Sequence, residues 1–249
     1  MVSVIYYNDA YYIYYGHGQG KLVLFKGSCI KSNKIKERVL KGSVNEYKME
    51  TNISRAKSKI IAYGLSNPWD WFITLTISPA KFDRTNLPAY RKKLAKYLNN
   101  QKRIKGHDIK YLLVPELHAD GKSWHLHGLL SGLPETELIV NDNGFLDWPG
   151  YNQRFGFCSL DKIKDPVKVV FYLTKYLTKQ IGQAVSINRQ SYYVSKGLKQ
   201  GEILYQGPYH EKEPVEGFEN DFVKVAWTHE RKVLEGFYEK GLDELPEAW

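Results

Sequence analysis

Cysteine and long apolar runs are scarce in this chain of 249 residues. Its two cysteines, Cys29 and Cys158, lie far apart and form no C-x-x-C pair, which excludes a disulfide framework or a zinc ribbon and fits a reducing compartment. No stretch approaches the ~18 consecutive apolar residues of a membrane span. The tyrosine-rich N-terminus lacks the basic start and apolar middle of a secretory signal. We therefore expect a soluble, cytoplasmic protein with no membrane partner.

Acidic residues are in the minority except at the C-terminal end. The chain carries a formal charge of +9. Residues 211–249 contain eleven Asp or Glu and five Lys or Arg, which leaves +15 on residues 1–210. A positive field of this size attracts polyanions, of which nucleic acid is the commonest. Solvated charge that only keeps a protein dissolved would give the same composition, so the charge favours nucleic acid without proving it.

The composition changes along the chain and predicts three segments. Residues 1–65 are basic and rich in tyrosine, and we expect them to form an N-terminal extension packed on the core. Residues 66–210 hold most of the predicted strands and helices, and the acidic residues 211–249 are expected to belong to the same domain. The N-terminal tyrosines could stack on unpaired bases, or they could pack on one another in a hairpin.

Strands and helices alternate in the middle segment. Residues 71–77 are rich in β-formers and predict a buried strand. Residues 88–105 predict a basic amphipathic helix, on which Arg91, Lys92 and Lys96 are candidates for contacts with DNA phosphates. Strands that share one sheet with flanking helices indicate the α+β class. Further strands are expected over residues 111–118, 124–130, 151–160, 191–204 and 222–227, with a short helix over 229–240.

The strands 111–118 and 124–130 are expected to form a hairpin that gathers polar side chains. Alternate residues of a strand face the same side, so Glu116 shares a face with His118, and His125 with His127. If the hairpin places His118 opposite His125, it also places Glu116 opposite His127. All four side chains then lie on one face. Pro115 indicates that the first strand is bulged or lies at an edge of the sheet.

Three imidazoles and a carboxylate on one face indicate a divalent metal, because these groups would be costly to bury without partners. Such ligands suit Mn²⁺, Zn²⁺ or Mg²⁺, and three protein ligands suffice where positions stay open for a substrate oxygen. A lone His-x-His pair is more often structural than metal-binding, and it is the facing strand that favours the metal here. Either Glu116 or His118 completes the set with His125 and His127.

A helix over residues 165–181 supplies a second group of candidate side chains. Asp165 is its expected N-cap, and Gly182 follows its expected end. Apolar residues fall on one of its faces. The simpler interpretation is that the rings of the other face cover the core, and the functional one is that they present two phenolic hydroxyls in a positive patch. That other face carries Tyr172, Lys175, Tyr176 and Lys179.

These residues resemble the HUH endonucleases, and within them the two-tyrosine rolling-circle replication initiators of phages and plasmids. Three motifs match in order: Phe72–Thr76 (FITLT), His125–His127 (HLH) and Tyr172–Tyr176 (YLTKY). The resemblance spans about residues 70–180 and implies a ferredoxin-like or RRM-like antiparallel sheet with flanking helices, within an endonuclease domain over 66–210. It also implies Mn²⁺ or Mg²⁺, with Glu116 favoured as the third ligand although His118 fits related members.

The same resemblance implies a mechanism and a substrate. A tyrosine would attack single-stranded DNA at an origin hairpin or nick site and form a 5′-phosphotyrosine. Tyr172 would act first, Tyr176 would act in the second strand transfer, and Lys175 would assist. Residues 16–22 do not form the P-loop that their glycines suggest, so we expect a separate helicase to unwind the DNA.

Two other functions fit the same residues. A transposase or relaxase would use the same metal and tyrosine chemistry for mobility or transfer. A basic RRM-like module would bind single strands by tyrosine stacking, with structural histidines and no cleavage.

Overall fold

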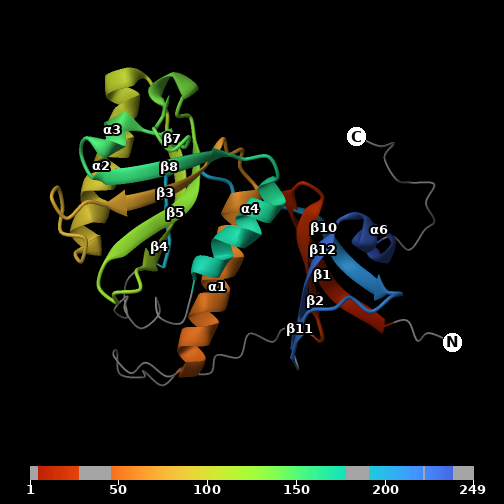
Figure 1. The fold of residues 1–249 in the computed structure, drawn as a ribbon. Helices are drawn as coiled ribbons and strands as arrows, with labels where there is room; N and C mark the ends of the chain where they lie inside the picture. The colour runs from red at the N-terminus through yellow and green to blue at the C-terminus, as the bar shows by residue number, and fades with distance from the viewer. Residues whose placement is uncertain (1–4, 28–45, 178–190, 221, 238–249) are drawn as a thin grey trace. The chain divides into compact units, whose positions relative to one another are not determined.

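Contacts group the chain into two compact units along boundaries that differ from the three expected segments. Strands near the N-terminus pair with strands near the C-terminus, so the two ends of the chain share one sheet. The α+β class is confirmed, whereas the ferredoxin-like identity stays a prediction. The computed structural model describes residues 5–27, 46–177, 191–220 and 222–237 (Figure 1). The units are residues 1–39 with 200–249, called the terminal unit, and residues 40–199, called the central unit.

The terminal unit contains a five-stranded antiparallel sheet in the order β10-β1-β2-β12-β11. Its first hairpin turns through His17 and Gly18, whose φ angles are +53° and +69°. A side chain at Gly18 would also meet the His229 ring at 2.1 Å, so this turn requires glycine. The elements are β1 (Ile5–Gly16), β2 (Gln19–Phe25), β10 (Glu202–Glu211), β11 (Phe218–Glu219), β12 (Val223–His229) and helix α6 (Arg231–Phe237).

The N-terminal tyrosines supply much of the core of this unit. Tyr7, Tyr12 and Tyr15 are buried, and the Tyr12 hydroxyl donates to the Thr228 carbonyl at 3.2 Å. Gly20 leaves room for the Tyr12 ring, because a Cβ there would lie 2.2 Å from it. The hairpin that packs its own rings is therefore the interpretation confirmed for these three tyrosines.

The central unit is built on a seven-stranded antiparallel sheet in the order β6-β7-β8-β3-β5-β4-β9. Helix α2 lies on one face of this sheet, and helices α1 and α4 lie on the other (Figure 1). The strands are β3 (Trp71–Ile77), β4 (Lys110–Leu117), β5 (Trp124–Ser131), β6 (Ile139–Val140), β7 (Leu146–Asp147), β8 (Gly156–Lys162) and β9 (Tyr193–Val194). The helices are α1 (Glu46–Leu65), α2 (Leu87–Lys105), α3 (Pro149–Asn152) and α4 (Pro166–Leu173), with 3₁₀ turns η1 (Glu135–Glu137) and η2 (Thr174–Tyr176).

The alternation of β3 divides the sheet into an apolar and a polar face. Ile73, Leu75 and Ile77 are at most 2% exposed and pack in one core with Leu94 and Leu98 of α2. The intervening residues of β3 are only partly buried and face away from α2. Strict alternation thus leaves the α1/α4 face of the sheet free to carry polar side chains.

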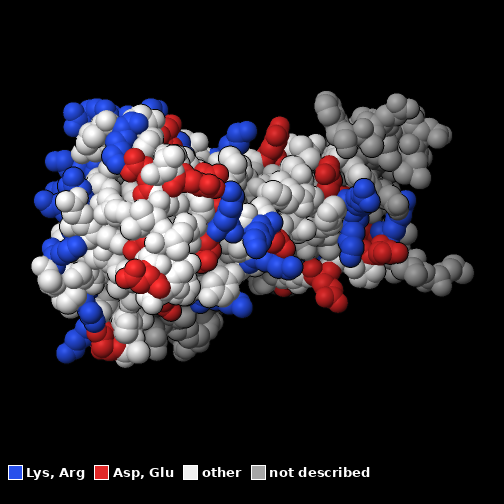
Figure 2. Space-filling model, turned by 45° about the horizontal axis from the view of Figure 1, so that its top comes forward, with Lys and Arg blue, Asp and Glu red and all other residues white. Residues whose placement is uncertain are grey.

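Helix α2 has the caps and apolar stripe expected of a basic amphipathic helix. The Asn86 side chain accepts from the amide of Ala89, and Gly106 ends the helix in the left-handed region at φ +77°. Most of its lysines and arginines are exposed, and cations gather on this side of the central unit (Figure 2). No helix in the described part of the chain is both long and apolar enough to cross a membrane.

Three sequence-predicted elements are wrong in extent. The strand expected over 151–160 begins only at Gly156, because Pro149 starts the short helix α3 instead. The strand expected over 191–204 contains only the two residues of β9, and β10 begins at Glu202. The helix expected over 165–181 has Asp165 as its N-cap, as predicted, but its α-helical part stops at Leu173.

The early end of α4 has a local cause. The Thr174 hydroxyl donates to the Phe171 carbonyl at 2.8 Å, and the chain tightens into the 3₁₀ turn η2. Threonine side chains that bond back to the preceding turn compete with regular helical bonding. The expected helix end at Gly182 lies outside the described residues.

Helices α1 and α4 approach closely where Gly64 meets Val170. A Cβ built at Gly64 would lie 2.6 Å from one Val170 methyl and 2.7 Å from the other. Val170 is 1% exposed and β-branched, so it cannot rotate away freely. Glycine at this position therefore sets the distance between α1 and the helix that leads to Tyr172.

Gly64→Ala should destabilise the central unit despite adding a better helix former. The substitution gains about 1 kcal/mol of helix propensity, but overpacking at a closed contact costs about 1–3 kcal/mol. We expect a net loss in thermal unfolding. Adding Val170→Ala should recover part of that loss, and a fully additive double variant would contradict the contact. Gly27→Ala is a control, since nothing lies within 4 Å of a Cβ there.

Candidate active site

The two histidines of β5 are held by the neighbouring strand β3. Thr74 lies opposite His127 and Thr76 opposite His125 in the β3–β5 pairing. Each threonine hydroxyl is hydrogen-bonded to the Nδ1 of the facing ring, at 3.2 Å for His127 and 3.1 Å for His125. Occupying both Nδ1 atoms fixes the ring orientations and leaves the Nε2 atoms for a ligand, which is the usual outer support of a metal-binding histidine.

The expected register of the β4–β5 hairpin is wrong by two residues. Glu116 lies opposite His125, not His127, and the amide of His118 bonds the Ser123 carbonyl. A shift of two residues keeps every side chain on its face, whereas a shift of one would have moved it to the other side. Glu116, His125 and His127 therefore still share the face that carries Thr74 and Thr76.

The shifted register changes direct partners into diagonal ones, and the side chains still meet. Glu116 Oε2 lies 2.7 Å from His127 Nε2. The rings of His118 and His125 stack with their centroids 4.7 Å apart. The pairs expected from the sequence are thus in contact, because diagonal neighbours on an antiparallel sheet remain within reach of long side chains.

Pro115 lies where β4 has a single partner strand. Strand β9 pairs with β4 only at Leu112 and Leu113, so in the described residues the Glu116 end of β4 is an edge. The β4–β5 pairing runs through Pro115 without a register shift, so the edge interpretation is confirmed and the bulge is not. This open edge leaves the Glu116 side chain 42% exposed.

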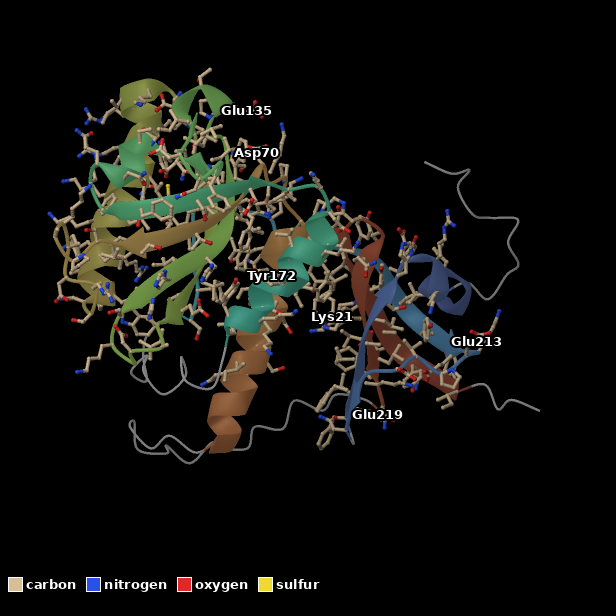
Figure 3. All side chains as sticks on the ribbon, viewed as in Figure 1. Lys21, Asp70, Glu135, Tyr172, Glu213 and Glu219 are labelled. Atoms are coloured by element: carbon tan, nitrogen blue, oxygen red, sulfur yellow. The ribbon has the colours of Figure 1, made fainter. Side chains whose placement is uncertain are left out.

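The two tyrosines of α4 and η2 lie directly over the histidines. The Tyr176 ring stacks on the His127 ring at a centroid distance of 3.8 Å and an angle of 7°. The Tyr176 hydroxyl donates to the Tyr172 oxygen at 2.8 Å. Tyr172 is 46% exposed, lies on α4 (Figure 3) and contacts the Phe72 ring edge-on at 5.8 Å. One sheet face and one helix end thus bring the second and third motifs together.

Burial lowers the pKa of both β5 histidines. For His127, burial outweighs the opposing hydrogen bond and charge of Glu116. For His125, the nearby imidazoles of His118 and His127 add to the effect of burial. Both rings are consequently neutral near pH 7, the protonation state in which imidazole binds a metal.

The pKa of Tyr176 lies well above its ordinary value. Burial is the largest cause, followed by the hydrogen bond to Tyr172 and the charges of Tyr172 and Glu116. Tyr176 therefore keeps its proton at neutral pH, which suits it as a donor to Tyr172.

The donor atoms at this site fit a divalent metal chemically but do not form a ready-made cage. The described residues hold no group of three or more His, Cys, Asp or Glu side chains placed to bind one ion. The candidates instead stand as two contacting pairs, Glu116 with His127 and His118 with His125. The Glu116–His127 pair is the one in which a carboxylate oxygen and a free Nε2 converge, so these atoms are the better placed to share a cation.

The cations expected to bind DNA are not all near this site. Arg91, Lys92 and Lys96 lie on α2, across the sheet from the histidines, and the Arg91 guanidinium packs over the Tyr193 ring at 4.6 Å. Lys175 does belong to the site, because its Nζ lies 5.4 Å from the centre of the Tyr172 ring. Lys179 lies outside the described residues.

Sequence reasoning quoted Thr74 and Thr76 within a motif but gave them no role. Their hydroxyls are the only groups in the described residues hydrogen-bonded to the Nδ1 atoms of His127 and His125. The signal was the matching period of Thr-x-Thr and His-x-His, which places both pairs on one face whenever the two strands are neighbours. Their adjacency, and so their contact, could not be read from the sequence.

Comparison with known proteins agrees with the position of this site. Neither a curated protein nor a solved structure matches the chain significantly. A family match, however, covers the strands, the hairpin and the tyrosine helix described above. Residues 70–181 match the family described as replication-associated protein ORF2, and this match supports a replication-initiator family for the chain.

Proposed function

We propose that the protein nicks and rejoins single-stranded DNA to initiate rolling-circle replication, as a two-tyrosine HUH endonuclease. The observation that carries this proposal is the stacking of Tyr176 on His127, with the Tyr172 oxygen 2.8 Å from the Tyr176 hydroxyl. Two phenols beside a histidine and carboxylate pair are the parts needed for metal-assisted attack on a phosphodiester. The match to a replication-associated family favours replication over transposition or transfer.

His125, His127 and Glu116 are the residues proposed to hold the metal, either Mn²⁺ or Mg²⁺. When bound, such an ion supplies Lewis-acid polarisation of a non-bridging phosphate oxygen. Thr74 and Thr76 keep the two imidazoles turned so that their Nε2 atoms remain available. His118 is the alternative third ligand, but it is exposed and stacks on His125 rather than meeting His127.

Tyr172 is the proposed first nucleophile because it is the exposed phenol and its oxygen accepts a hydrogen bond. That bond comes from Tyr176, whose raised pKa keeps the proton on the donor. A donor aimed at an oxygen stabilises negative charge that develops there. Lys175, over the Tyr172 ring, adds a positive charge near the reacting phosphate.

The reaction conserves a phosphodiester. The Tyr172 oxygen forms a bond to phosphorus while the bond from phosphorus to the 3′ oxygen breaks. The phenol loses its proton, and the departing 3′ oxygen gains one and leaves as a hydroxyl. The product is a 5′-phosphotyrosine, which a later 3′ hydroxyl can attack to restore a DNA strand. Tyr176 is proposed to carry the second transfer, and a separate helicase to unwind the duplex.

Glu116→Ala should weaken Mn²⁺ binding more than His118→Ala does. Glu116 meets His127 at 2.7 Å, whereas His118 lies at the exposed end of the hairpin. Loss of a direct ligand should lower affinity by on the order of 100-fold, beyond the effect of an outer-shell group. Calorimetric titration with Mn²⁺ measures this, and Glu135→Ala removes an exposed carboxylate elsewhere as the control. A larger loss for His118→Ala would reverse the assignment.

A covalent-adduct assay tests the proposed function. The protein is incubated with end-labelled single-stranded DNA and Mn²⁺, using oligonucleotides that include hairpins, and resolved on a denaturing gel. We expect a protein–DNA adduct that chelation of the metal prevents. The variant with both Tyr172→Phe and Tyr176→Phe should give no adduct but should still bind DNA.

Two outcomes would overturn the proposal. An adduct that persists in the double phenylalanine variant would place the nucleophile elsewhere. Tight single-strand binding with no adduct on any substrate would instead favour a non-catalytic single-strand-binding module.

A further inference from the structure

A pocket lies immediately beside Tyr172, on the side away from the histidines' strand partners in β4. It encloses about 600 Å³, which is within the range of small-ligand sites. Its walls come from β3, from the segment after β8 and from α4, all within the central unit. Its apolar lining includes Phe72, Ile163, Val167, Phe171 and Tyr172.

The aromatic side chains of this pocket are unusually accessible. Phe171 is 39% exposed and Tyr172 46% exposed, although both are large hydrophobic residues. Phe72 is partly buried and holds Tyr172 edge-on. Exposed aromatic faces in a concave site favour a flat partner that can stack on them.

Lysines line the same pocket and give it a positive rim. These are Lys162, Lys168 and Lys175, against one carboxylate in the lining, Asp161. Lys162 pairs with Glu135, and Lys168 pairs with its neighbour on α4's N-cap, Asp165, but all four side chains are well exposed to solvent. Exposed ion pairs of this kind are weak, so a phosphate can replace the carboxylate partner.

We infer that this pocket, called the base pocket below, binds one unpaired nucleobase of the DNA strand that Tyr172 attacks. The inference rests on the proposed function. An unpaired nucleotide combines the two features that the pocket complements: a flat base for the aromatic walls and phosphates for the lysine rim. An apolar ligand without charge would leave the three rim lysines unused.

The position of the base pocket gives it a role in choosing the site of cleavage. Tyr172 contributes its ring to the pocket, and its oxygen lies at the hydrogen bond with Tyr176. A base seated on Phe171 therefore places its own phosphate next to the nucleophile. The pocket would act as a positioning subsite that decides which phosphodiester of a single strand is presented for attack.

The test measures binding without cleavage, in chelator, by anisotropy of labelled single-stranded oligonucleotides with one abasic position moved along the strand. For the wild-type protein, we expect one position at which loss of the base weakens binding by roughly tenfold. Phe171→Ala should weaken binding of the intact strand to the same extent and should be insensitive to the abasic position. Phe171→Trp, which keeps a stacking face, should restore the sensitivity.

The matched control is Phe145→Ala, which removes a 55% exposed phenylalanine elsewhere in the central unit and should leave the position effect unchanged. The inference is overturned if no abasic position matters, or if the same position costs as much in Phe171→Ala as in the wild type. Preferential binding of an acidic aromatic peptide over single-stranded DNA would also overturn it. Because no cleavage is needed, a missing covalent adduct would defeat the proposed chemistry and leave the base-pocket result readable.

Discussion

Tyr172→Phe should lower the rate of first-strand cleavage by on the order of a thousandfold, because loss of a nucleophile costs far more than loss of a helper group. The ring keeps its edge contact with Phe72, so only the hydroxyl is removed. Some residual adduct is expected from Tyr176, whose oxygen lies 2.8 Å from the missing one. Single-turnover cleavage of a labelled oligonucleotide measures the rate, and peptide mapping identifies the modified tyrosine.

Tyr176→Phe is the matched variant for the same assay. It retains the stacking on His127 and removes the hydrogen bond donated to Tyr172. One such bond contributes about 0.5–1.5 kcal/mol, so first-strand cleavage should slow by roughly tenfold at most. Rejoining in a second transfer should fail. If Tyr176→Phe abolished the first cleavage and Tyr172→Phe did not, the proposed order of the tyrosines would be reversed.

Lys224→Met should destabilise the terminal unit far more than the loss of an ordinary surface lysine would. Lys224 and Glu211 are both buried, and the ammonium bonds the carboxylate directly. The Tyr7 hydroxyl and the Val215 amide also donate to Glu211. Removing the ammonium leaves a buried charge uncompensated, which costs about 3–5 kcal/mol. Hydrogen exchange of β2 and β12 amides reports this loss.

This loss should depend on pH in a defined direction. Burial alone would raise the pKa of Glu211, but the bonds from Lys224, Val215 and Tyr7 more than offset it, so its folded pKa lies below the ordinary value. The stabilisation is therefore fully present above the unfolded pKa of about 4.3 and is lost as pH falls toward the folded pKa. The difference between Lys224→Met and wild type should shrink in acid.

An exposed pair provides the control for this prediction. Lys102 pairs with Asp108 at 3.1 Å, with side chains 67% and 49% exposed. Lys102→Met should change stability by less than about 1 kcal/mol. Equal effects of the two substitutions would show that burial of the Glu211–Lys224 pair has no energetic consequence.

Local sequence patterns were sufficient for elements whose signals are contained in a few neighbouring residues. The β-formers of 71–77 gave β3 with its observed bounds, and the capping residue Asp165 marked the start of α4. Patterns failed where a competing local bond or a distant strand decides the structure. The Thr174 hydroxyl ended α4 early, and β10 starts late because its partner is β1, at the opposite end of the chain.

The sequence by itself determined which side chains can share a face. The period of two along β4 and β5 placed Glu116, His125 and His127 together, and helical spacing placed Tyr172 near Tyr176. These relations survive a register shift of two residues because such a shift preserves the alternation of faces.

Only the tertiary structure decided which of these side chains touch. Sheet order sets β3 beside β5, so that Thr74 and Thr76 hold the histidine rings. The packing of α4 on α1 places the tyrosines over His127 and puts the cations of α2 on the other face. Contacts between segments far apart in the chain depend on strand order and helix packing, which side-chain periodicity within one segment does not encode.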